Sequence, residues 1–263
     1  MKVVPKKSLG QNFLLNQEII KKIIDVGQIS EDCNLIEIGP GTGNLTKEII
    51  KKKYSRFITI EKDKKLYLQL QKKYSSNIEF FNEDVLDIDW NSFINQKIIV
   101  FGNLPYNISA KLLISWIKLS NLNKIFKRFI LMFQKEVADR ILAKSNSSKY
   151  GRLSILTEWK LDAHKIMDIE PENFYPVPKV KSTLIYLEPK KNIFKLNNSK
   201  YLEQVTNIFF QNKRKMIKKP LNILFENPAK VISKFKLDIN NRPQNLEPLT
   251  YFKLSKEYED QSR

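Results

Sequence analysis

The sequence predicts an α/β protein: a seven-stranded, mostly parallel sheet with helices on both faces, followed by a small all-helical domain. Two observations carry this prediction. Short apolar runs alternate with amphipathic stretches up to Pro189, and beyond it only helical patterns separated by turn residues remain. We therefore expect a first domain over 1–189 and a second over 190–263.

Length and composition are those of a globular chain with room for one large and one small domain. The 263 residues include 42% hydrophobic and 28% charged side chains, with only 7 glycines and 11 prolines, which excludes a low-complexity body. The uncharged stretch 98–110 contains Gly102 and Pro105 and is too short to cross a bilayer. We find no secretion signal, and the single Cys33 lacks a disulfide partner and metal-ligand spacing. We therefore expect a cytoplasmic monomer without a bound metal.

The charge balance favours a polyanionic partner. The chain has 46 Lys and Arg against 28 Asp and Glu, a net charge of +18, which attracts nucleic acid. Acidic membranes and simple solubility stay open as alternatives, because the chain is rich in Lys, Ile and Asn, as AT-biased coding produces. Charge alone therefore favours a nucleic-acid partner without identifying it.

The elements of the first domain follow in order from residue 35. Runs of strand length alternate with runs of helical period, which is typical of parallel strands joined by helices, and such sheets bind ligands beyond the carboxyl ends of their strands. The seven expected strands lie in the runs 35–39, 56–61, 78–85, 97–103, 128–134, 153–161 and 180–189, with helices over 45–53, 64–74, 110–119 and 135–144. In the second domain we expect helices over 200–225, 229–237 and 250–260.

The segment EIGPGTGNLT, residues 37–46, lies between an expected strand and an amphipathic helix. Gly39, Gly41 and Gly43 follow the pattern G-x-G-x-G, whereas the dinucleotide-binding pattern is G-x-G-x-x-G. The glycines let the backbone approach a ligand closely, but their spacing argues against a nicotinamide cofactor. A plain tight turn is the alternative for this segment taken alone.

Two carboxylates extend this site. Glu61 ends the next strand, 22 residues after Gly39, where an acid can accept both hydroxyls of a ribose. Asp84 follows the third strand, where it can accept a hydrogen bond from an adenine amino group. Each acid alone could be a solvated residue at a strand end. Together with the glycine loop at consecutive strand ends, they predict a site for adenosine.

The segment GNLPYNIS, residues 102–109, directly follows the apolar run KIIVF. The exocyclic amine of adenine is a poor nucleophile, because its lone pair is delocalised into the ring. The Asn103 side-chain oxygen and the Leu104 carbonyl, held by Pro105, can accept both amino hydrogens and turn the nitrogen toward a methyl donor. Tyr106 offers a flat face for adenine stacking. Alone, Asn-x-Pro could be an ordinary turn; in frame with the earlier features it predicts methyl transfer to adenine N6.

These motifs occur in order with several others along nearly the whole chain: KKSLGQNFL (6–14), IEKD (60–63), EDVLD (83–87), MFQKEVADR (132–140), YGRLS (150–154) and FYPVPKVKS (174–182). In this ensemble the chain resembles the ribosomal RNA adenine N6-dimethyltransferases. The resemblance implies a Rossmann-like, class I S-adenosylmethionine-dependent methyltransferase domain with a small helical domain behind it.

The resemblance also implies roles for particular residues. It places S-adenosylmethionine against Asn12, Leu14, Gly39, Glu61, Asp84 and Asn103, and we expect Gly41 of the glycine loop beside it. The residues expected to grip the target adenine are Asn103, Leu104, Pro105, Tyr106 and Phe174. For Phe174 the residues themselves leave open a core position at the entry to a strand. No metal takes part.

The activity implied is dimethylation of N6 in two adjacent adenines near the 3′ end of 16S ribosomal RNA, in the assembling small subunit. One alternative is the related macrolide-resistance type, which acts on 23S ribosomal RNA. Another is an RNA-binding assembly factor without catalysis, against which the intact Asn103, Tyr106 and Glu61 argue.

Basic residues in two places are expected to contact RNA phosphates: Lys6 and Lys7 near the N-terminus, and Lys213, Arg214 and Lys215 in the second domain. We expect the second group to lie on a helix. Pro220 stands where members of the family commonly have a small polar residue, and it should limit how far that helix runs.

Overall fold

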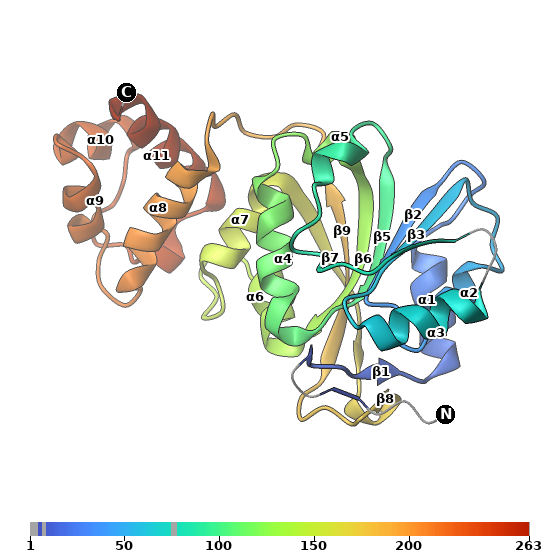
Figure 1. The fold of residues 1–263 in the computed structure, drawn as a ribbon. Coiled ribbons are helices and arrows are strands. Elements are labelled where there is room, and N and C mark those ends of the chain that lie inside the picture. The colour runs from blue at the N-terminus through green and yellow to red at the C-terminus, as the bar shows by residue number, and fades with distance from the viewer. Residues whose placement is uncertain (1–4, 7–8, 75–77, 263) are drawn as a thin grey trace. The chain divides into compact units, whose positions relative to one another are not determined.

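The computed structural model describes residues 5–6, 9–74 and 78–262. The chain forms two compact units (Figure 1): residues 1–138 with 162–189, and residues 139–161 with 190–263. The chain therefore enters the second unit, returns to complete the first, and ends in the second.

The first unit is built on a seven-stranded sheet with the order β4-β3-β2-β5-β6-β9-β7. The strands are β2 (Asn34–Ile38), β3 (Arg56–Ile60), β4 (Glu79–Phe81), β5 (Ile98–Asn103), β6 (Phe126–Gln134), β7 (Leu161–Ile169) and β9 (Ser182–Pro189). β2 to β6 are parallel, and β9 is antiparallel to β6. This confirms the predicted mostly parallel sheet. From β2 the chain builds the sheet first toward β4 and then, through β5, in the opposite direction, so the order reverses between β2 and β5.

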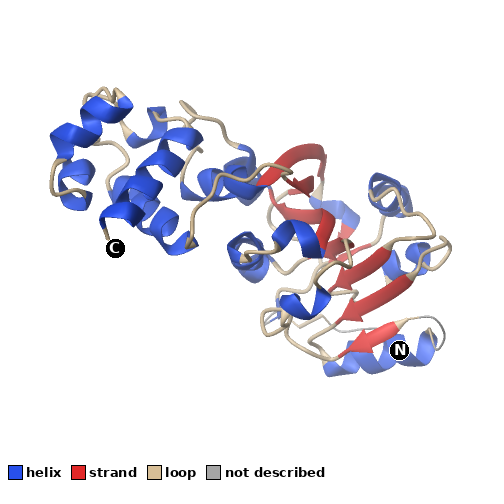
Figure 2. Ribbon diagram, turned by 90° about the horizontal axis from the view of Figure 1, so that it is seen from above, coloured by secondary structure: helices blue, strands red, loops and turns tan. Residues whose placement is uncertain are grey.

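Helices lie on both faces of this sheet (Figure 2). They are α1 (Gln17–Val26), α2 (Asn44–Ile49), α3 (Lys64–Lys73), α4 (Tyr106–Lys118) and α5 (Leu122–Ile125), and α6 (Lys135–Leu142) follows β6. Short 3-10 helices cover Trp90–Phe93 and Pro171–Asn173. Helix α1 begins after Asn16, whose side chain accepts hydrogen bonds from the backbone of Glu18 and Ile19.

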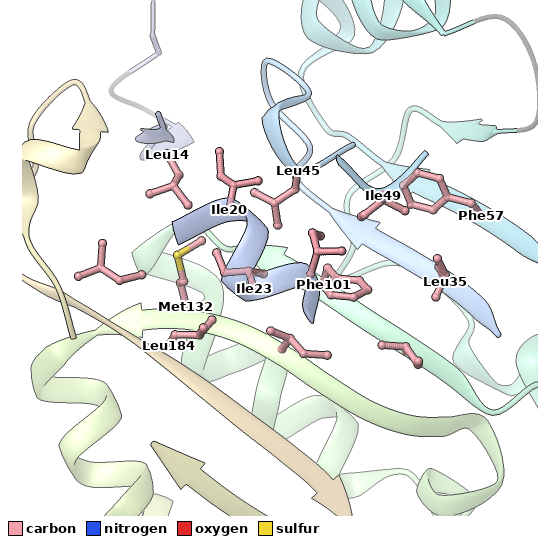
Figure 3. Close-up of a cluster of buried hydrophobic side chains, with 14 of the residues drawn as sticks. Leu14, Ile20, Ile23, Leu35, Leu45, Ile49, Phe57, Phe101, Met132 and Leu184 are labelled. Carbon is pink, nitrogen blue, oxygen red and sulfur yellow. The ribbon is translucent and has the colours of Figure 1, made fainter. Parts of the chain in front are cut away.

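A cluster of buried apolar side chains joins α1 to the sheet (Figure 3). Ile20 and Ile23 lie one turn apart on one face of α1, and each is at most 1% exposed. The same cluster contains Leu35 of β2, Phe101 of β5 and Met132 of β6. Close packing here fixes the two strands between which the sheet order reverses.

A second, two-stranded sheet holds the N-terminal segment against the first unit. β1 (Phe13–Leu14) pairs antiparallel with β8 (Phe174–Tyr175). The Asn44 side chain at the start of α2 donates a hydrogen bond to the Leu14 carbonyl over 2.6 Å. Residues 13 and 14 are thus tied both to a segment 160 residues away and to the helix after the glycine loop.

The second unit is helical, as predicted. It contains α7 (Arg152–Lys160), α8 (Ser199–Gln211), α9 (Lys218–Leu224), α10 (Pro228–Phe235), α11 (Pro248–Gln261) and a 3-10 helix over Pro243–Asn245. The rings of Phe209 and Tyr251 join α8 to α11 at 5.4 Å between centroids. Glu259, 1% exposed, accepts a hydrogen bond from Asn198 N at the start of α8. Among the described residues, no helix is long and apolar enough to cross a bilayer.

One expected strand is wrong. Residues 153–161 form helix α7 up to Lys160, and the sheet instead takes β7, which begins at Leu161. Most of α7 is buried: Leu153, Ser154, Ile155, Leu156, Thr157, Trp159 and Lys160. A helix buried nearly all round has no polar face, so its short apolar run cannot be told from a buried strand by periodicity.

The segment 139–161 lies in the second unit, although we expected it in the first domain. α7 contacts both α8 and α11. The rings of Tyr150 and Phe210 pack edge to face, with centroids 6.2 Å apart. The segment precedes the last strand of the sheet in sequence, which suggests the first domain. Its packing against α8 and α11, which follow much later in the chain, cannot be predicted from its own residues.

The basic residues 213–215 do not lie on a helix. α8 ends at Gln211 and α9 begins at Lys218, so the three residues occupy an exposed turn between the two helices. Pro220 lies in the first turn of α9, where its missing N–H interrupts no intrahelical hydrogen bond. It therefore marks the start of a helix and does not limit a preceding one.

Candidate active site

A cavity lies at the carboxyl ends of the central strands of the first unit. Its walls are the loops after β2, β3, β4 and β5 and the N-terminal arm, defined here as residues 9–14. Open α/β sheets bind ligands where the strand order reverses. The cavity brings together these predicted site residues: Asn12, Leu14, Gly39, Gly41, Glu61, Asp84, Asn103, Leu104, Pro105 and Tyr106.

The loop after β2 needs glycine for two reasons. Gly39 and Gly41 have φ values of +64° and +59°, in the left-handed region that other residues rarely adopt. A Cβ atom at Gly41 would also lie 2.8 Å from the ring of Phe13. The loop and the N-terminal arm therefore pack together only because this position has no side chain.

Glu61, directly after β3, is held by backbone N–H groups. Its Oε2 accepts from Gly41 N at 3.1 Å and its Oε1 from Asp63 N at 2.8 Å. The side chain is largely buried, and burial raises the pKa of Glu61, while these two hydrogen bonds act in the opposite direction. Each oxygen keeps a further lone pair, so Glu61 can accept hydrogen bonds from a ligand in the cavity.

Glu37 of β2 also lines the cavity, and the sequence reasoning missed it. It is 2% exposed, and burial raises its pKa to about 8. The Thr46 hydroxyl donates to Glu37 Oε2 at 2.6 Å. The carboxyl is therefore predominantly protonated at neutral pH. The available signal was an acidic residue inside the otherwise apolar strand LIEI.

Asp84, after β4, is paired with a lysine at the cavity wall. Lys62 Nζ lies 2.6 Å from Asp84 Oδ2, and Leu86 N donates to Oδ1 at 3.0 Å. Burial alone would raise the pKa of Asp84, but the bonds from Lys62 and Leu86 keep it below its ordinary value. Asp84 is therefore an ionised hydrogen-bond acceptor at the cavity.

Asn103, at the end of β5, is oriented by the N-terminal arm. Its Nδ2 donates to the Asn12 carbonyl at 2.7 Å. An amide that donates through nitrogen in one direction presents its Oδ1 in another, so the side chain keeps an acceptor for a second group. Leu104, the next residue, is 1% exposed, and Pro105 forms the N-cap of α4.

Tyr106 is the first residue of α4, and its hydroxyl is 2.7 Å from Ser182 Oγ of β9. Burial raises the pKa of Tyr106, with the bond to Ser182 acting against that rise. The phenol is therefore neutral, and its ring is fixed at both ends, by the helix backbone and by the hydroxyl contact.

Phe174 lies in the core and not in the cavity wall. The residue is 2% exposed, it pairs with Leu14 in the β1–β8 sheet, and it belongs to the hydrophobic cluster that contains Ile20 and Ile23 of α1. This is the core position that the sequence left open as the alternative. In this arrangement the ring is covered and has no face for a base.

The basic residues predicted to contact RNA lie in different settings. Lys6 is engaged by the buried carboxylate of Asp63 at 3.0 Å, and Lys7 falls outside the described residues. In the second unit, the turn residues 213–215 are exposed, and Lys213 Nζ reaches the Ser148 carbonyl at 3.2 Å.

Fold and site together define a Rossmann-like methyltransferase. The structure is similar to the crystal structure of a dimethyladenosine transferase from Plasmodium falciparum, with a TM-score of 0.82 and 28% identity over 95% of this chain and 98% of that one. It also has the fold of the 23S rRNA methyltransferase ErmE, with a TM-score of 0.70 and 21% identity over 94% of this chain and 99% of that one.

The family model "Ribosomal RNA adenine dimethylase" matches residues 4–260, and the chain belongs to this family. It is an rRNA adenine dimethyltransferase. The chain is 51% identical over 260 residues, 99% of both chains, to the ribosomal RNA small subunit methyltransferase A of Pelagibacter ubique (strain HTCC1062). A relative of the same name from Wolbachia sp. subsp. Brugia malayi (strain TRS) is 45% identical over 188 residues, covering 70% of this chain and 71% of that one.

Proposed function

We propose that this chain uses S-adenosylmethionine to dimethylate N6 of two adjacent adenines near the 3′ end of 16S ribosomal RNA, in the assembling small subunit. The observation that carries the proposal is the convergence of Glu61, Asp84 and Asn103 on one cavity at the carboxyl ends of neighbouring strands. Two curated relatives at 51% and 45% identity carry the small-subunit name. This favours 16S over 23S ribosomal RNA as the substrate.

The donor would lie along the glycine loop. Glu61 is placed to accept the ribose hydroxyls, since it lines the cavity while backbone N–H groups hold its carboxylate still. Asp84, kept ionised, is placed to accept a hydrogen bond from the donor's adenine amine. Asn12 and Leu14 would form the wall of the donor site where the N-terminal arm lines the cavity. When bound, S-adenosylmethionine supplies a methyl group activated by its sulfonium.

The target adenine would be held by the residues after β5. Asn103 Oδ1 and the Leu104 carbonyl accept the amino hydrogens, which localises the lone pair on N6 and directs it toward the methyl carbon. The bond from Asn103 Nδ2 to the Asn12 carbonyl supports this role, because it fixes the direction of the amide oxygen in advance. Tyr106, fixed through Ser182, offers its ring for stacking.

The exposed basic turn at 213–215 would contact RNA phosphates. Phosphate contacts make affinity salt-dependent and leave base selection to the shape of the RNA and the accessibility of its unpaired bases. The chain would act as a cytoplasmic monomer, with the small subunit in assembly as its partner.

The test incubates the protein and its Asn103→Ala variant with labelled donor and purified small or large subunits that lack the modification, and maps the labelled bases. We expect label on two adjacent adenines of 16S ribosomal RNA with the wild type. The variant should lose nearly all transfer while its donor affinity, measured by calorimetry, stays nearly unchanged. Label on 23S ribosomal RNA would assign the chain to the other substrate. Full transfer by the variant would remove the role given to Asn103.

A further inference from the structure

The N-terminal arm is tied to the loop after β3 through one carboxylate, Asp63. Lys6 Nζ lies 3.0 Å from both carboxylate oxygens of Asp63. Gln11 Nε2 donates to Asp63 Oδ2 at 3.1 Å, and the Gln11 Oε1 accepts from Lys6 N at 2.8 Å. Lys6, Gln11 and Asp63 therefore form a closed set of contacts, named here the Asp63 latch.

The carboxylate of this latch is buried, whereas its lysine reaches it from the surface. The Asp63 side chain is 3% exposed and that of Lys6 is 51% exposed. Burial alone would raise the pKa of Asp63, but the bonds from Lys6 and Gln11 lower it below its ordinary value. Asp63 is thus an ionised buried group whose negative charge is balanced mainly by Lys6. Moving Lys6 away would leave this charge less compensated.

Asp63 is also joined to the donor cavity from the other side. Its backbone N–H donates to Glu61 Oε1 at 2.8 Å, and its side chain caps α3 by accepting from Lys65 N at 3.0 Å. The N-terminal arm, held by the latch, lines the same cavity. One residue therefore connects the arm, the acid assigned to the donor ribose and the start of a helix.

We propose that Asp63 is a positioning residue that holds the N-terminal arm closed over the donor cavity through Lys6 and Gln11, and so slows donor release. This rests on the proposed function, because it takes the cavity to be the S-adenosylmethionine site. It also gives Lys6 a role different from the phosphate contact expected from the sequence. The other ties of the arm, from Asn103 to the Asn12 carbonyl and from Asn44 to the Leu14 carbonyl, involve neither Lys6 nor Asp63.

The test measures the dissociation rate of S-adenosylhomocysteine by stopped-flow chase in the full-length protein. Lys6→Met removes the charge from an exposed position, and Asp63→Asn keeps a side chain that can still cap α3. We expect each variant to release the ligand roughly ten-fold faster, as for the loss of one charged hydrogen bond. Combining the two changes should add little, because both break the same contact. Lys6→Arg should restore slow release.

A matched control is Lys53→Met. It removes a lysine from a surface pair with Glu31, at 2.7 Å and with both side chains mostly exposed. This variant should release the ligand at the wild-type rate. Hydrogen exchange in residues 9–11 should be faster in Lys6→Met than in Lys53→Met, which reports opening of the arm beside Asp63 independently of ligand.

The outcomes separate the two proposals. Wild-type protein that binds ligand, with Lys6→Met releasing it at the wild-type rate, would overturn the latch and leave the donor site intact. The same holds if Asp63→Asn only lowers the melting temperature and does not change the release rate. Wild-type protein that binds neither S-adenosylmethionine nor S-adenosylhomocysteine would overturn the proposed function and the latch with it.

Discussion

Replacing Glu37 by glutamine tests whether a neutral acid is built into the cavity wall. The side chain is 2% exposed and accepts a 2.6 Å hydrogen bond from the Thr46 hydroxyl. Glutamine has nearly the same shape, stays neutral at every pH, and can accept the same bond through its Oε1. The substitution therefore removes the titration and little else.

The magnitude follows from the two pKa values. Burial raises the pKa of Glu37 from 4.5 to about 8 in the folded chain. Each pKa unit corresponds to about 1.4 kcal/mol, so the difference amounts to roughly 5 kcal/mol of stability. The sign follows from the raised pKa of the folded state. The contribution of Glu37 to the free energy of unfolding is fully present below pH 4.5, where its carboxyl is protonated in both the folded and the unfolded chain. It is lost as the pH rises to about 8, because the unfolded chain ionises first.

The assay is urea unfolding of wild type and Glu37→Gln at intervals from pH 5 to pH 8.5. The two proteins should be close in stability near pH 5, and the variant should become the more stable by several kcal/mol near pH 8. Glu31→Gln, at a side chain that is 73% exposed, is the matched control and should differ little from wild type throughout. A stability difference between Glu37→Gln and wild type that stays constant across this range would refute a buried, protonated Glu37.

Two further predictions concern binding. Glu61→Ala should weaken S-adenosylmethionine by about 1 to 3 kcal/mol, the value of a hydrogen bond to a charged group; calorimetry with equal affinities would remove the ribose assignment. Replacing both Lys213 and Arg214 by alanine should reduce the slope of log affinity for 16S ribosomal RNA against log salt by about 2, measured by filter binding at several salt concentrations. An unchanged slope would place the phosphate contacts elsewhere.

The sequence was sufficient for the parts of the fold that depend on local period. Six of the seven strands and the helices α2, α3, α4 and α6 were found because a parallel sheet with helices on both faces repeats one pattern. The short helix α5 was not predicted. The exception among the strands, α7, is buried nearly all round and so has no amphipathic period. The turn at 213–215 was missed for the opposite reason, since its lysines suit an exposed helix as well as an exposed turn.

The site residues that could be predicted are those whose positions follow from local sequence patterns, and the others depend on contacts between distant segments. Glu61, Asp84 and Asn103 each follow a strand, and parallel strands bring their carboxyl ends to one edge of the sheet, so local patterns imply that these residues meet. The positions of Phe174 and Lys6 depend instead on which distant segments pair, β1 with β8 and the N-terminus with Asp63. An aromatic residue in a proline-rich loop and a lysine in a basic segment suit a ligand contact and a structural contact equally. The Phe174 ring faces the core because Phe174 pairs with Leu14 in this register. The two strands are 160 residues apart in the chain, so neither segment alone contains a pattern that predicts their pairing.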